Sequence, residues 1–425
     1  MTKTIPAPIQ DPQKLRAYRV YLAFQFINAA LLYTAFVVDS LFFVVEANLN
    51  PLQLVLVGTA LEVTVFLFEV PTGVVADTIS RRLSVIIGTV LIGLGWLMQG
   101  LLPVFWAILL AQLVWGLGVT FNSGALQAWI ADEVGVEHSD GAFLRGAQFQ
   151  QIGAIFGIIF GTLLGTVFTA LPLIVSGALF LLLAAGLIAV MPENGFSPAS
   201  NGERTSWKNM TGVFHSGTKL VRSQPVLLAI LLLSLFYGLY SEGLDRLWVA
   251  HMLERFTFPL FKPVVWFGII QGAAMLLAAG VIEWVKRRLD TGHIHKLVRT
   301  LLLTSALLVI SLAGFALVRN LWFSMGLFIL ITVLRETNYP LFTAWTNRHL
   351  ESQSRATVLS MVSLVDAIGQ IGGGPWVGWI ANQVSMQAAL LTSTGLLSPV
   401  LFILGKRVKN ENGGETSPDK PSRLL

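Results

Sequence analysis

The stretch EVPTGVVADTISRR, residues 69–82, decides how the whole chain has to be interpreted. It places Glu69 within an apolar run and ends on Asp77, Arg81 and Arg82. The same pattern fits the rim of a soluble core and the polar end of a membrane-spanning helix. The composition of the rest of the chain separates these two possibilities.

The chain is unusually apolar. Of its 425 residues, 54% are hydrophobic and only 12% are charged, whereas soluble domains carry about 25% charged residues. A polytopic membrane protein is therefore predicted. The absence of cysteine excludes disulfides, thiolate nucleophiles and zinc–thiolate sites. The net charge of +5 does not indicate a nucleic-acid partner, because the basic residues do not gather on a soluble face.

Apolar residues are gathered in runs of about twenty, the length that a helix needs to cross a bilayer. The first run is predicted to be a retained span, because it is too long for a signal-peptide core and lacks a small-x-small cleavage site. A polar interval then divides the runs into six and six. Twelve spans are predicted, at about 20–45, 51–76, 83–101, 104–130, 146–170, 172–191, 225–249, 263–285, 297–318, 320–346, 356–382 and 386–405.

Basic residues indicate the orientation of these spans. If the N-terminus is cytoplasmic, most of the 28 Lys and Arg residues fall in the inside loops and the two tails, which predicts that both termini are cytoplasmic. In the polar interval, apolar residues at helical spacing fit either a helix lying on the inner membrane surface or a disordered linker. The predicted organisation is a cytoplasmic N-tail (1–19), an N-terminal six-helix bundle (20–191), a cytoplasmic linker (192–224), a C-terminal six-helix bundle (225–405) and a cytoplasmic C-tail (406–425).

The two halves resemble each other in sequence. The fourth predicted span contains NSGALQAW (122–129), and the tenth contains NYPLFTAW (338–345). Asp39 in the first span corresponds to Asp245 in the seventh. Two similar halves in one membrane chain are typical of a transporter that rocks about a site between them.

The chain resembles the Major Facilitator Superfamily in the segment between its second and third spans. Four residues match the family's pattern G-x-x-x-D-R-x-G-R-R/K, namely Gly73, Asp77, Arg81 and Arg82. The chain departs from it at Thr78 and Ser80, where the family usually has a basic residue and a glycine. The phrases EVPTGVVAD, SGALQAWIADE and SEGLDRLW are similar to the bacterial drug-efflux branch that includes macrolide exporters. The resemblance implies an all-α integral membrane fold of twelve helices in two pseudo-symmetric halves, placed in the bacterial cytoplasmic (inner) membrane.

The resemblance also implies that the motif acts as a conformational latch. Its glycine would let a neighbouring helix approach closely, and its aspartate, near a helix C-terminus, needs a cationic partner. An ion-pair cluster that forms in one conformation and opens in another biases a rocking equilibrium. The alternative is that the two arginines only set the topology. The predicted latch residues are Gly73, Asp77, Arg81, Arg82, Asp132 and Glu133.

Ionisable residues within the spans are the candidates for substrate binding or proton coupling, because a charged side chain at the bilayer centre costs roughly 2.5–3.5 kcal/mol. Glu62, near the midplane, could bind a proton or a cationic substrate, or form a permanent pair with Arg335. Arg335 keeps its charge and needs a carboxylate nearby, and we expect Glu62 or Asp366 to supply it. The full set of candidates is Asp39, Glu62, Arg335, Glu336, Asp366 and Gln370.

Three further features bear on the mechanism. Glu242 and Arg246 are spaced i,i+4 in the order that favours a structural ion pair. The fifth span carries a ladder at Gly153, Gly157, Gly161 and Gly165, whose small-xxx-small spacing predicts close helix packing. Many drug:proton antiporters have an arginine in the fourth-span pattern R-x-x-Q-G, but this chain has Gln112 and Trp115 before Gly116. All histidines are predicted to lie in loops or tails, which leaves carboxylates to carry protons.

The sequence thus predicts a secondary active transporter that exports small amphipathic or lipophilic compounds in exchange for protons. The alternatives are an uptake carrier or facilitator, an exporter of a lipid or siderophore-like metabolite, and a non-transporting membrane sensor. No enzyme is expected, because the chain lacks a Walker-type loop and a recognisable nucleophile–base pair. We expect a monomer whose partners are a small-molecule substrate and the lipid bilayer, with no nucleic acid, no metal and no cofactor besides the proton gradient.

Overall fold

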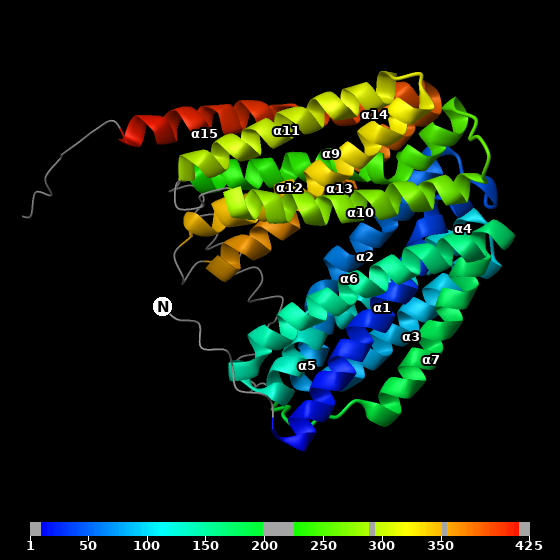
Figure 1. The fold of residues 1–425 in the computed structure, drawn as a ribbon, viewed down its shortest axis with the longest axis vertical. Helices are drawn as coiled ribbons and strands as arrows, with labels where there is room; N and C mark the ends of the chain where they lie inside the picture. The colour runs from blue at the N-terminus through cyan, green and yellow to red at the C-terminus, as the bar shows by residue number, and fades with distance from the viewer. Residues whose placement is uncertain (1–9, 199–224, 289–293, 351–354, 416–425) are drawn as a thin grey trace, which may run out of the picture. The chain divides into compact units, whose positions relative to one another are not determined.

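The computed structural model describes residues 10–198, 225–288, 294–350 and 355–415. All regular structure in these ranges is α-helical (Figure 1). The predicted surface helix or disordered segment within 192–224 lies largely outside them. The helices are α1 (Pro12–Val45), α2 (Pro51–Thr78), α3 (Arg81–Leu101), α4 (Phe105–Asn122), α5 (Ala125–Val134), α6 (Val136–Val167), α7 (Leu171–Val190), α9 (Pro225–Arg255), α10 (Pro263–Arg288), α11 (Ile294–Leu317), α12 (Leu321–Arg348), α13 (Arg355–Gln383), α14 (Met386–Leu397) and α15 (Pro399–Glu415).

Several helices begin where the local sequence predicts a start. Pro51 opens α2 directly after Asn50, whose side chain forms a capping box with Gln53, and proline in the first turn loses no intrahelical hydrogen bond. Ser80 caps α3, because its Oγ accepts a hydrogen bond from the Leu83 N–H at 2.9 Å. The motif quoted above therefore contains a helix end, a two-residue break and a new helix start.

Ten helices in the described ranges are long and apolar enough to cross a membrane. The segments α4–α5 and α14–α15 each count as one of them. Helices α12 and α13 are long enough, with 28 and 29 residues, but are too polar to be counted, since α12 carries Arg335 and Glu336 and α13 carries Asp366. The number twelve therefore stays a prediction. Helix α1 also begins before the predicted span, and α15 continues into the predicted C-tail.

The chain forms two compact units. Unit 1 comprises Met1–Gly212 and Phe258–Ile269, and unit 2 comprises Val213–Thr257 and Ile270–Leu425. The first turns of α10 therefore group with unit 1, although the prediction places them in the C-terminal bundle. In unit 1, a buried core cluster around Trp129 and Tyr21 joins residues of α1, α2, α3, α5, α6 and α7.

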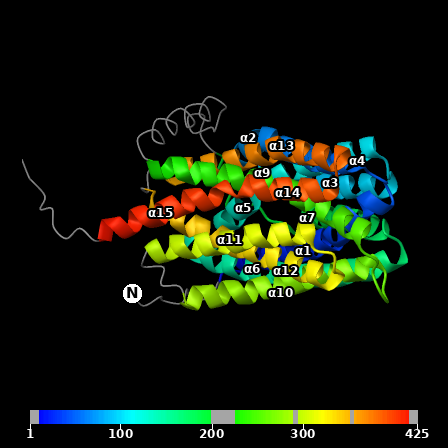
Figure 2. The ribbon, with the colours of Figure 1, turned by 90° about the horizontal axis from the view of Figure 1, so that it is seen from above.

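In each unit, glycines allow one pair of helices to approach each other very closely. In unit 1, α1 packs along α6, and a Cβ added at Gly157 would lie 2.3 Å from the carbonyl oxygen of Ala30. In unit 2, α9 and α13 lie side by side (Figures 1 and 2), and a Cβ at Gly373 would lie 2.2 Å from the carbonyl oxygen of Leu239. The predicted packing role of the ladder is confirmed, because Gly153 and Gly161 make equally close approaches. The α9–α13 pair is the counterpart in unit 2 of the α1–α6 pair in unit 1, because each pair consists of the first and fifth predicted spans of its half.

The fourth predicted span is broken. Helix α4 ends at Asn122 and α5 begins at Ala125, and between them Gly124 has φ 70°, a left-handed conformation that favours glycine. The matching position of the second half is Pro340, which lies inside α12. Both halves thus place a helix-disrupting residue at the same point of the repeat.

Candidate functional site

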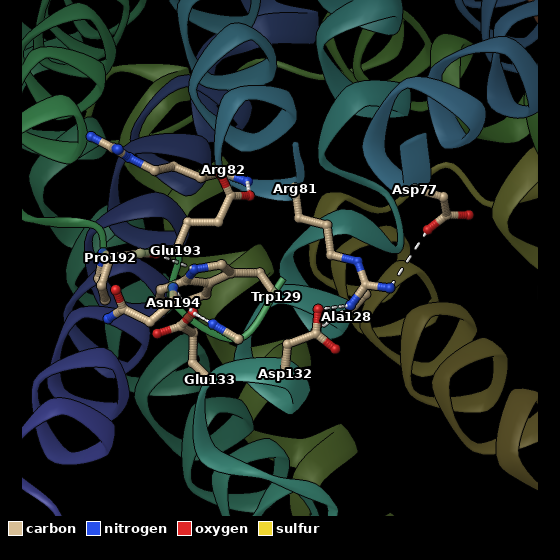
Figure 3. A network of polar contacts seen from close by, with 11 residues as sticks. Asp77, Arg81, Arg82, Ala128, Trp129, Asp132, Glu133, Pro192, Glu193 and Asn194 are labelled. Atoms are coloured by element: carbon tan, nitrogen blue, oxygen red, sulfur yellow. Dashed lines mark hydrogen bonds and ion pairs between the residues drawn. The ribbon is translucent and has the colours of Figure 1, made fainter. Parts of the chain in front are cut away.

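Arg81 joins three elements at one end of unit 1 (Figure 3). Its guanidinium pairs with Asp77 of α2 at 3.7 Å and with Asp132 of α5. Its Nη1 also donates to the carbonyl oxygen of Ala128 at 3.0 Å. The start of α3 is therefore tied to the end of α2 and to α5 through one side chain, which brings together three of the predicted latch residues.

Arg82 points away from this pair (Figure 3). Its guanidinium donates to the carbonyl oxygen of Ile188, in the last turn of α7, while its backbone N–H donates to Glu193 Oε1 at 2.9 Å. The other oxygen of Glu193 accepts from the Ser80 hydroxyl at 2.7 Å. Helix ends leave N–H and C=O groups without intrahelical partners. Here α3 and α7 cap each other, because a carboxylate beyond α7 caps α3 and an arginine of α3 caps α7.

Glu133, at the end of α5, is only 7% exposed. Its Oε1 accepts hydrogen bonds from the backbone N–H groups of Asn194 at 2.6 Å and Gly195 at 2.8 Å. Beside it, Trp129 Nε1 donates to the carbonyl oxygen of Pro192 at 2.7 Å. The predicted latch acid Glu133 therefore binds the chain that follows α7, and it forms no ion pair with an arginine of the described residues.

Two latch predictions need correction. Gly73 was expected to admit a neighbouring helix, but a Cβ there would meet open space. Arg82 was expected to pair with the latch acids, but its guanidinium caps α7 because the helix geometry of α3 turns consecutive side chains about 100° apart. Glu193 was missed entirely, since a cap formed across more than a hundred residues leaves no local sequence signal.

A second polar cluster lies within unit 1. Asp39 of α1, 5% exposed, accepts a hydrogen bond from Gln99 of α3. Gln99 Oε1 in turn accepts from Gln112 Nε2 of α4 at 2.8 Å. One helical turn from each of these residues stands an aromatic ring, and Phe36, Trp96 and Trp115 pack with centroids 5.4–5.6 Å apart. The residue found in place of the antiporter arginine thus completes a buried chain that joins three helices.

Replacing Gln99 with leucine should destabilise unit 1 through this chain. Asp39 loses its amide donor and Gln112 loses its acceptor, and a hydrogen bond to a charged group contributes about 1.5–3 kcal/mol. The thermal unfolding midpoint of the purified protein should fall in Gln99→Leu and stay unchanged in Gln150→Leu, an exposed residue of α6. Equal midpoints for the two variants would contradict a stabilising role for the chain.

In unit 2, Arg335 of α12 pairs with Asp245 of α9. Its two terminal nitrogens donate to the two carboxylate oxygens at 2.5 and 2.8 Å, and its guanidinium lies 5.8 Å from the centroid of the Tyr240 ring. The expectation of Asp366 or Glu62 as the partner of Arg335 is therefore wrong. Helical periodicity gave the face on which Arg335 lies but could not say which helix packs against that face.

The remaining candidates are spread over other helices. Asp366 of α13 accepts a hydrogen bond from Gln370 Nε2 at 2.8 Å, and the charge of Arg335 also acts on it. Glu62 is half-buried on α2, and Glu336 is exposed on α12. Asp366, Gln370 and Arg335 therefore share a neighbourhood within unit 2, and Glu336 directly follows Arg335 on α12 with an exposed side chain.

Two other features concern α9. Glu242, 3% exposed, accepts a hydrogen bond from Arg246 Nε at 2.8 Å, as the i,i+4 spacing predicts. His251, expected in a loop, instead lies in α9 at 2% exposure, with Nε2 3.2 Å from the carbonyl oxygen of Phe315. The prediction about the histidines is wrong here because α9 extends to Arg255, beyond the apolar run that defined the span.

Comparison with known proteins gives the family and the fold. The sequence model of the Major Facilitator Superfamily matches residues 21–374. The MFS-type transporter YxaM of Bacillus subtilis (strain 168) is 21% identical over 379 residues, which cover 87% of this chain and 91% of that protein. The crystal structure of the nucleoside transporter NupG superposes with a TM-score of 0.72 at 15% identity, covering 94% of this chain and 100% of that one. An inward-facing, unoccupied bacterial homologue of the human lysosomal transporter Spinster gives 0.71 at 12% identity, covering 97% and 100%. At these identities the two structures establish the shared fold.

Proposed function

The chain belongs to the Major Facilitator Superfamily and is an integral membrane transporter, and from this premise we propose that it exports small amphipathic compounds in exchange for protons. The proposed setting is the bacterial cytoplasmic membrane, with twelve spans and both termini in the cytoplasm. The proposed mechanism is alternating access, in which the Arg81 cluster is formed in one conformation and opened in the other. The similarity to phrases of the drug-efflux branch supports the export direction.

Asp366 carries the proposal of proton coupling. Among the residues that the structure describes, its carboxylate accepts one hydrogen bond, from the neutral amide of Gln370, and forms no ion pair. Arg335, the nearby cation, is already engaged by both oxygens of Asp245. An ionised carboxylate in a membrane span costs about 2.5–3.5 kcal/mol, and binding a proton removes that cost. Asp366 is therefore suited to take up a proton in one state and release it in the other.

Arg335 gives the release step a physical basis. A guanidinium keeps its proton at all accessible pH values, so its position sets the local field. When Arg335 moves closer to Asp366 during the rocking motion, the ionised carboxylate is stabilised and the proton leaves. When it stays bidentate on Asp245, the protonated form of Asp366 is favoured.

The test uses the purified protein in liposomes that contain a pH-sensitive dye. Addition of an exported compound from a panel of lipophilic dyes such as ethidium should move protons in the parent protein. Asp366→Asn should abolish the proton movement, because an amide cannot carry the proton, while Asp140→Asn, an exposed acid of α6, should behave like the parent. Compound movement that ignores the proton gradient in the parent protein would indicate a facilitator and contradict the proposal.

A further inference from the structure

Residues 192–196, which begin two residues after the end of α7, all contact other parts of unit 1, and we call them the strap. Pro192 accepts from Trp129, Glu193 accepts from Ser80 and from the Arg82 N–H, and the phenyl ring of Phe196 lies 5.8 Å below the Arg81 guanidinium. The two residues between them, Asn194 and Gly195, donate their N–H groups to Glu133. Figure 3 shows the labelled strap residues beside the Arg81–Asp132 pair.

The strap packs directly behind the acid that Arg81 uses. A Cβ added at Gly195 would lie 2.3 Å from the carbonyl oxygen of Asp132 and 3.2 Å from the backbone nitrogen of Glu133. The two backbones are therefore in contact at the residue whose carboxylate pairs with Arg81. A strap that moved from this position would remove the backbone packing behind Asp132.

Glu133 links the docking of the strap to the end of α5. It is nearly buried, and two strap N–H groups donate hydrogen bonds to its carboxylate. Leaving a buried carboxylate without hydrogen bonds costs more than a typical bond contributes. Glu193 acts in the same way on the other side, because its negative charge lies at the N-terminus of α3, where the helix dipole favours it. The strap is thus held by two carboxylates, that of Glu133 at the end of α5 and that of its own Glu193, which binds the start of α3.

We infer that Glu133 and Glu193 are positioning residues of the latch, and that the Arg81–Asp132 pair forms only while the strap is docked. The strap is also the first part of the predicted linker between the two bundles, so its docking fixes where that connection leaves unit 1. The effect of strap docking on transport rests on the proposed alternating-access function. Its test needs no substrate, so its failure and the failure of proton coupling are separate results.

The chain has no cysteine, so a Met191→Cys reporter introduces a single thiol. Met191 is 3% exposed and directly precedes the strap. The full-length protein carrying this reporter is labelled with N-ethylmaleimide in detergent, and the rate of labelling is measured by mass. Glu133→Ala should raise the rate about tenfold or more, since it removes two hydrogen bonds to a charged group. Glu133→Gln keeps an acceptor and should give an intermediate rate.

The decisive variant leaves Glu133 and its hydrogen bonds to the strap unchanged. Arg81→Gln should also raise the rate of labelling at position 191 severalfold. The control is Arg145→Gln, which removes an exposed arginine that is hydrogen-bonded to Gln148, and the two variants are compared only if their melting temperatures are equal. Arg145→Gln should label at the parent rate. If Arg81→Gln is poorly folded, Asp132→Asn takes its place. Labelling that rises in Glu133→Ala but stays at the parent rate in Arg81→Gln and Asp132→Asn would overturn the inference, because the strap would then open independently of the latch.

Discussion

Gly373→Leu should eliminate the folded transporter, whereas Gly372→Leu, one residue away, should leave it intact. A Cβ at Gly373 would lie 2.2 Å from the carbonyl oxygen of Leu239, and a Cβ at Gly372 would meet nothing within 4 Å. A carbonyl oxygen of a neighbouring helix cannot move aside as a flexible side chain can. Overpacking by extra methylenes costs about 1–3 kcal/mol and sometimes more, and leucine at this position forces α9 and α13 apart along their length.

The measurement is the yield of monodisperse protein after extraction, followed by the thermal unfolding midpoint. Gly373→Ala should be intermediate, with a lowered midpoint, because it adds one carbon at the point of contact. Gly157→Leu should repeat the result in unit 1, where the nearest atom is the carbonyl oxygen of Ala30 at 2.3 Å. Equal yields of the two neighbouring variants in α13 would contradict the contact between α9 and α13.

Asp245→Ala should destabilise unit 2 and stop transport. The substitution removes both acceptors of the Arg335 guanidinium, and an arginine within a span then costs up to about 3 kcal/mol. Because the side chains of Arg335 and Asp245 are 28% and 44% exposed, we expect the loss of stability to be smaller than for a fully buried pair. The loss of transport should be complete under the proposed mechanism, in which Arg335 held by Asp245 sets the electric field at Asp366.

A double-mutant cycle isolates the pair. Asp245→Ala combined with Arg335→Gln should recover much of the lost stability, because no uncompensated charge remains. Transport should not recover, which separates the packing role of the pair from its role in the cycle. Arg335→Gln with Asp366→Ala should show a smaller coupling in unfolding free energy than the Asp245 pair, because Asp366 forms no hydrogen bond with Arg335. If the changes in unfolding free energy of Asp245→Ala and Arg335→Gln were strictly additive, the ion pair would contribute nothing to stability.

The sequence allowed the helical membrane architecture to be predicted because the signals are local. Apolar runs, capping residues and prolines each act within a few residues, so the start of α2 at Pro51 follows from the Asn50 cap alone. The ladder from Gly153 to Gly161 was also predictable, since its four-residue spacing places small residues on one helix face. The same role for Gly369 and Gly373 could have been found by comparing the fifth span with the eleventh.

Partners across helices could not be predicted. Periodicity placed Arg335 on a face of α12, but three acids in different helices could have met that face, and Asp245 does. Glu193 caps α3 from a segment more than a hundred residues later, a contact that depends entirely on how α3 packs against α7. Burial of His251 follows from the extra length of α9, which continues beyond its apolar run.

The interruption at Gly124, with its counterpart at Pro340, has a mechanical consequence. Helix α5 is a short segment joined to α4 at Gly124, and Asp132, one of the two acids that pair with Arg81, lies on it. If the Arg81–Asp132 ion pair opened, the break at Gly124 would let α5 change direction while α4 kept its packing. A rigid rod through the same position would have to tilt as a whole, so each half can respond at one end without repacking the other.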